Sequence, residues 1–188
     1  MKKEREYCGF CPFLFVFFIL GIPFLWTNEH QWSPLHVASL RGHVEVVKLL
    51  LAHPNINVNL KSNAEQTPLS FGCEYGQVSV VRVLLKDPRV DITMDDNSGC
   101  TPLWCASHNG NYKVIEWLIA SGRDLGDFEN KKGKWKGEDL TALEIARNCS
   151  RLKLCLCLRD SLPTKYRPVM NFGRGLEGWM RWQLRSLP

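Results

Sequence analysis

The sequence predicts an all-α solenoid of stacked helix-turn-helix repeats, and three observations support this fold class. A proline recurs at one constant spacing, a glycine recurs at the same spacing, and an apolar segment follows each glycine: Pro34, Pro68 and Pro102; Gly42, Gly76 and Gly110; residues 44–51, 78–85 and 112–119. A unit of this size cannot bury both of its helices alone, so its stability must come from stacking on neighbouring units.

The first helix of each unit carries its own start and stop signals. Ser33, Thr67 and Thr101 each precede the proline. The hydroxyl can therefore cap the helix, while proline takes the first position, where no amide hydrogen is needed. The glycine that ends the segment suits a left-handed C-cap.

The second helix has an apolar face broad enough to be covered by neighbours on two sides. It is expected to stop at Pro54, Pro88 or Gly122. A short extended piece follows, at residues 56–59 and 90–93, and leads to a polar turn such as residues 95–99. We therefore expect short β-hairpin turns that project along one edge of the stack.

The helix starts resemble those of ankyrin repeats, whose signature is Thr-Pro-Leu-His-x-Ala. They read Ser-Pro-Leu-His-Val-Ala, Thr-Pro-Leu-Ser-Phe-Gly and Thr-Pro-Leu-Trp-Cys-Ala, and a fourth start lies at residues 141–146. Each unit is one residue longer than the usual period of the family, and in this respect it resembles fungal-type members. His36 keeps the motif histidine, which in that family is a structural residue that bonds neighbouring backbone. Gly72 replaces the motif alanine and Glu65 the hairpin glycine, so the second repeat is expected to be the loosest.

The periodicity divides the chain into seven segments. We assign an apolar N-terminal segment to residues 1–30, and repeats to residues 31–60, 61–94 and 95–126. A basic insert at 127–140 precedes a partial fourth repeat at 141–158 and an irregular tail at 159–188. The insert is expected to form an exposed loop or extended hairpin, with a basic contact patch as the alternative.

Composition and charge exclude several classes of protein. With 45% hydrophobic and 23% charged residues, the chain is an ordinary globular one, neither collagen, disordered nor a multi-pass membrane protein. The net charge of +5 is uneven, because residues 31–126 carry 8 basic against 9 acidic residues. The repeats are therefore not expected to bind nucleic acid.

No residue pattern indicates catalysis, a cofactor or a metal. Cys8 and Cys11 lack a second ligand pair at zinc spacing, because Cys155 and Cys157 lie too close together. The eight cysteines are expected to be mostly buried free thiols in a reducing compartment. The glycine pattern at residues 173–178 lacks the strand and helix that dinucleotide binding requires.

The resemblance implies a non-catalytic protein–protein interaction module that binds through its concave surface. Contacts are then expected from the turn tips and the exposed side of the first helices. In this sequence those residues are Trp32, Leu40, Arg41, Asn63, Gln66, Glu74, Tyr75, Asn97, His108 and Asn109. The partner is an unidentified protein, and we expect a cytoplasmic monomer with no cofactor.

Two alternatives depend on the ends of the chain. Residues 7–26 are apolar and long enough to cross a bilayer, which would make the protein a membrane-anchored adaptor with cytoplasmic repeats. The prolines and glycine within this segment favour instead a buried segment or a mistranslated leader. The repeats would otherwise be the targeting fragment of a larger enzyme. From Ser150 onward the expected second helix is missing, although a shifted reading frame is compatible with one. We therefore expect a frameshifted or mis-spliced tail, with residues 160–188 disordered or poorly packed.

Overall fold

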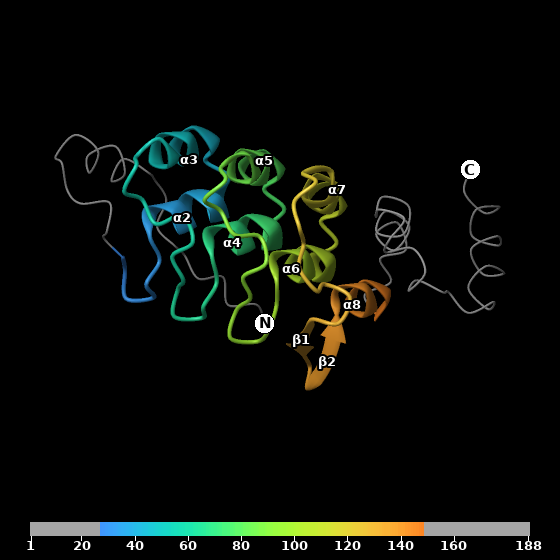
Figure 1. Cartoon of the computed structure of the whole chain (residues 1–188). Helices are drawn as coiled ribbons and strands as arrows, with labels where there is room; N and C mark the ends of the chain where they lie inside the picture. The colour runs from blue at the N-terminus through green and yellow to red at the C-terminus, as the bar shows by residue number, and fades with distance from the viewer. Residues whose placement is uncertain (1–26, 149–188) are drawn as a thin grey trace, which may run out of the picture.

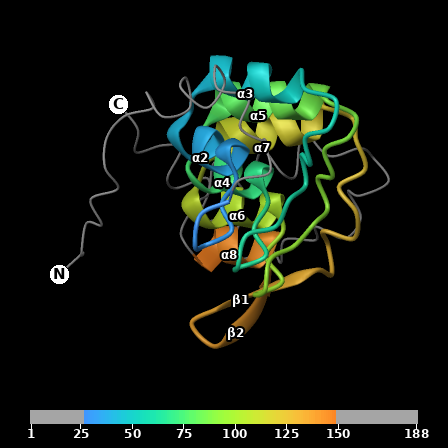
Figure 2. The ribbon, with the colours of Figure 1, turned by 90° about the vertical axis from the view of Figure 1, so that its left-hand side faces the viewer.

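The computed structural model describes residues 27–148, which form two layers of short helices (Figure 1). The first layer contains α2 (Pro34–Arg41), α4 (Pro68–Glu74), α6 (Pro102–Asn109) and α8 (Ala142–Asn148). The second layer contains α3 (Val44–Leu51), α5 (Val78–Lys86) and α7 (Tyr112–Ala120). Each helix contacts its equivalent in the next repeat, and Figure 2 shows each layer nearly end-on. The predicted all-α solenoid is confirmed.

The helix starts and stops follow the sequence signals. The side chains of Ser33, Thr67 and Thr101 each accept a hydrogen bond from the backbone N–H of the third helical residue. Gly42 and Gly110 close α2 and α6 in the left-handed conformation, with φ of 76° and 72°. The sequence period therefore reproduces the same capped helix in successive repeats.

The core is built from positions that recur with the same period as the prolines and glycines. These positions are fully or almost fully buried and lie on both helices of each repeat: Leu35, Leu69 and Leu103; Val47, Val81 and Ile115; Leu50, Leu84 and Leu118. Because the helices of one repeat pack on those of the next, the apolar surface is shared between units.

The connections between repeats are turns, and this corrects the expectation of short β-hairpins there. Each turn tip is joined to the tip before it by backbone and amide hydrogen bonds. The backbone N–H of Asn97 donates to the carbonyl of Ala64, and its Nδ2 donates to the carbonyl of Asn63, both at 3.1 Å. Asn63 makes the equivalent bonds to His30 and Glu29. The turn tips thus form a continuous ladder without strands.

In the described part of the chain, strand pairing occurs only in the insert. Strands β1 (Lys132–Trp135) and β2 (Glu138–Thr141) pair antiparallel, with Trp135 opposite Glu138. Gly133 is buried so closely that a Cβ there would lie 2.6 Å from Cys100 Sγ. Trp104 Nε1 donates to the carbonyl of Leu140 at 2.7 Å. The insert is therefore an extended hairpin that packs on the third repeat.

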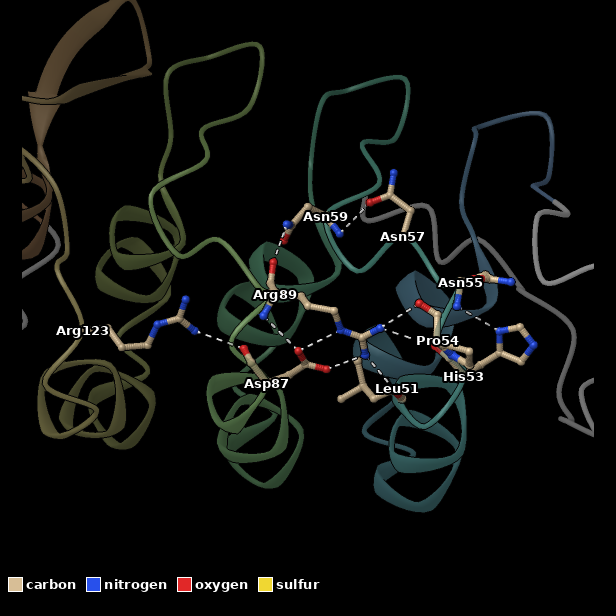
Figure 3. Close-up of polar contacts among 9 residues, drawn as sticks. All are labelled: Leu51, His53, Pro54, Asn55, Asn57, Asn59, Asp87, Arg89 and Arg123. Atoms are coloured by element: carbon tan, nitrogen blue, oxygen red, sulfur yellow. Dashed lines mark hydrogen bonds and ion pairs between the residues drawn. The ribbon is translucent and has the colours of Figure 1, made fainter.

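Arginines at the same position of two repeats join consecutive units at the C-terminal ends of the second-layer helices (Figure 3). Arg89 donates to the carbonyl of Leu51, the last residue of α3, and to those of His53 and Pro54 just beyond it, at 2.7 to 3.4 Å. It also donates to the Asp87 carboxylate. Arg123, at the equivalent position of the next repeat, donates to the carbonyls of Asp87 and Val90. A cation at a helix C-terminus satisfies carbonyls that lack intrahelical partners.

Several sequence predictions fall on residues 1–26 and 149–188, outside the described residues. These are the membrane segment at 7–26, the frameshifted tail, the glycine pattern at 173–178 and five of the eight cysteines. Within residues 27–148, no helix combines the length and apolar character needed to cross a bilayer.

Candidate protein-binding surface

A hollow of about 470 Å³ lies between the first two repeats, beside the turn tips. We call it the aromatic hollow. Its walls come from the residues before α2, the turn between the first two repeats, the C-terminal half of α4 and the residue that caps this helix: His30, Trp32, Asn63, Ala64, Gln66, Phe71, Glu74 and Tyr75. Its volume falls within the range of small-ligand clefts.

Three aromatic side chains form one wall of the aromatic hollow. The rings of Trp32 and Phe71 meet edge to face with centroids 5.0 Å apart, and Tyr75 stacks on Phe71 at 6.5 Å. Phe71 is buried, whereas 56% of Tyr75 is exposed. The buried ring therefore supports a tyrosine that is open to a partner.

Two polar side chains that line the hollow are linked by a hydrogen bond, and the backbone of one of them is also bonded. Gln66 Nε2 donates to the Glu74 carboxylate at 3.1 Å, and the Gln66 carbonyl bonds His36 Nε2 at 3.0 Å. Burial raises the pKa of Glu74; the Gln66 hydrogen bond opposes this and the nearby Asp96 charge adds to it. Burial and the Glu74 charge likewise raise the pKa of Tyr75, against the charge of Arg41.

A family model of ankyrin repeats (3 copies) matches residues 13–96 and 56–129, which together span more than half of the chain. The chain belongs to the ankyrin repeat family. No curated protein matches the chain in a sequence comparison. Ankyrin repeats are generally protein–protein interaction modules, so the surface of the stack is the place to seek a binding site.

The structure brings half of the ten predicted contact residues of this ankyrin stack into one place. Trp32, Asn63, Gln66, Glu74 and Tyr75 all line the aromatic hollow. Asn97 adjoins it, because its Nδ2 donates to the carbonyl of Asn63. Leu40 and Arg41 lie at the C-terminal end of α2.

The remaining two predicted residues lie beside the hairpin. His108 stacks on Trp104 with centroids 5.3 Å apart and meets Trp135 at 5.7 Å. Asn109 is exposed, and its Nδ2 donates to the carbonyl of Cys105 at 3.0 Å. The hairpin therefore packs over part of the surface that the sequence assigned to a partner.

Three further residues line the aromatic hollow and are not among the predicted contacts: His30, Ala64 and Phe71. A usable signal existed for Phe71, because the equivalent positions of the repeats before and after it hold the smaller Val37 and Cys105. A bulky aromatic at one repeat alone indicates a local role rather than a stacking role.

The motif histidine is structural, as the family resemblance implies. His36 is fully buried, and its Nδ1 lies 2.8 Å from Ser33 Oγ, while Nε2 bonds the next turn. Burial lowers its pKa, although hydrogen bonds to the carbonyls of Gln66 and Leu60 oppose that shift. His36 thus joins the first two repeats.

The cysteines that the structure describes are buried free thiols. Cys73, Cys100 and Cys105 form no disulfide, and burial raises the pKa of each thiol. Over residues 27–148, no three histidine, cysteine or carboxylate side chains gather closely enough to hold a metal ion.

Proposed function

We propose that this chain is a non-catalytic module that binds a partner protein through its concave surface. The concave surface comprises the turn tips and the C-terminal ends of the first-layer helices, where the ten predicted contact residues lie. The aromatic hollow is the observation that supports this proposal. It presents an exposed tyrosine on a buried aromatic support, and interface hot spots favour rigid aromatic side chains in such settings.

The aromatic hollow also has polar groups that can orient a bound segment. The Asn63 and Glu74 side chains lie at its wall, and the exposed Asn97 adjoins it. An apolar wall with a few fixed polar groups is the usual composition of a recognition site. An extended segment that crosses the turn tips could contact both the aromatic and the polar side chains of the hollow.

The experiment is a selection of a phage-displayed random peptide library on the purified full chain. Tyr75→Ala removes the exposed ring of the hollow. Tyr112→Ala on α7 is the matched control, because that ring is 44% exposed on the second layer. Selected peptides should bind Tyr75→Ala at least about tenfold more weakly and Tyr112→Ala as tightly as the parent. Equal binding to all three proteins would contradict the proposal.

A further inference from the structure

We propose that the aromatic hollow receives a cationic side chain, lysine or arginine, from an extended segment of the partner. This inference rests on the proposed function and specifies the chemistry of the contact. Three groups support it: the Glu74 carboxylate, the rings of Trp32 and Tyr75, and the neighbouring Asp96.

Glu74 is the main reason for a positive ligand. Its carboxylate is half-buried at the wall of the hollow and receives one neutral hydrogen bond, from Gln66. Among residues 27–148, no ion pair includes Glu74. A half-buried carboxylate without a cation retains much of its desolvation cost, and a ligand cation beside it would offset that cost.

The aromatic wall suits the same ligand. Lysine and arginine carry a long apolar stem and a charged head, so the stem can pack on a ring while the head reaches a carboxylate. A cation over the face of tryptophan or tyrosine is also attracted by the ring quadrupole. Tyr75 and Glu74 both line the aromatic hollow, so both contacts are available to one side chain.

The surrounding charges favour a cation overall. Asp96 is close enough for its charge to raise the pKa of Glu74. Arg41 is the opposing charge, since it acts on Tyr75 from the end of α2. Two carboxylates against one guanidinium leave the hollow negative, and Arg41 should weaken binding of a cationic segment.

The junction between the second and third repeats lacks this combination. In the third repeat, the positions equivalent to Gln66, Glu74 and Tyr75 hold Cys100, His108 and Asn109, so no carboxylate replaces Glu74 there. The hairpin also packs against Trp104 and His108 of the third repeat. We therefore expect one cationic site, between the first two repeats.

The test uses an immobilised positional-scanning decapeptide library in which each position holds lysine, arginine or the uncharged norleucine. The full chain should prefer lysine or arginine over norleucine about tenfold at one position, and less strongly as salt increases. Glu74→Gln should abolish this preference. Glu45→Gln, an exposed change on α3, is the matched control and should keep it. Arg41→Gln should strengthen it.

The outcomes separate this inference from the proposed function. Peptides that depend on Tyr75 but show no cationic preference, or a preference that survives Glu74→Gln, overturn the inference alone. Binding that is absent or independent of Tyr75 overturns both. The melting temperature of Glu74→Gln should not fall below that of the parent, because the change removes a half-buried charge. With the fold intact, a lost preference for lysine or arginine cannot be due to misfolding.

Discussion

Leu50 and Leu49 are adjacent on α3 but have opposite environments, which makes them a sharp test of the repeat packing. Leu50 is 4% exposed within the shared core, whereas Leu49 is 52% exposed. Leu50→Ala removes a side chain whose burial is worth about 1.5–3 kcal/mol and leaves a cavity between the repeats. The free energy of unfolding should therefore fall by about 2–5 kcal/mol. Leu49→Ala should cost about 1 kcal/mol or less, because half of that side chain already meets water.

The assay is thermal and urea unfolding of both variants, followed by circular dichroism in the far ultraviolet. If residues 31–126 unfold as one cooperative unit, Leu50→Ala should lower the single transition by several degrees. A melting temperature within about 2 °C of the parent, or a larger loss in Leu49→Ala, would refute the register of α3 in the stack.

Three further changes test the caps, junctions and turns of the stack. The hydrogen bond from Arg89 lowers the pKa of Asp87, so this pair stabilises the fold above about pH 4. That stability is lost as pH falls through the lower folded-state pKa. Below about pH 4, the free energy of unfolding measured with urea should therefore depend less on pH in Asp87→Asn than in the parent. The lowered pKa of His36 means that its stability contribution is complete above about pH 6.5 and is lost on acidification. Between about pH 7 and pH 5, the free energy of unfolding measured with urea should therefore fall more with decreasing pH in the parent than in His36→Gln. Glu65 has a φ of 58°, which costs an ordinary residue about 1 kcal/mol, so Glu65→Gly should raise the free energy of unfolding by about that amount.

The helices and caps could be predicted because their causes are local and recur. A hydroxyl before proline and a glycine after the helix act within one turn, and the buried leucines recur at the same place in every repeat. The hairpin and the arginine bridges depend on distant partners. Trp104 bonds Leu140, 36 residues later, and Arg89 reaches Leu51, 38 residues earlier. Neither partner has a distinctive residue type, since both contribute only a backbone carbonyl.

The candidate site could be predicted only in part for the same physical reason. The family resemblance indicated the turn tips and first helices, and five of those residues line the hollow. It could not show that Phe71 would support Tyr75, because the contact depends on side-chain packing across a repeat junction. It also could not show that the hairpin would pack against His108.

The position of the aromatic hollow on the second repeat follows from how stability is shared in a stack. This repeat departs from the pattern at Glu65, Phe71, Gly72, Glu74 and Tyr75, and three of these side chains line the hollow. The half-buried carboxylate of Glu74 in this site reduces stability. The second repeat is packed on both sides, since α4 contacts α2 and α6, and α5 contacts α3 and α7. Two interfaces can offset losses that a terminal repeat, with one interface, would have to bear alone. A site built from unfavourable residues is therefore tolerated best on an internal repeat.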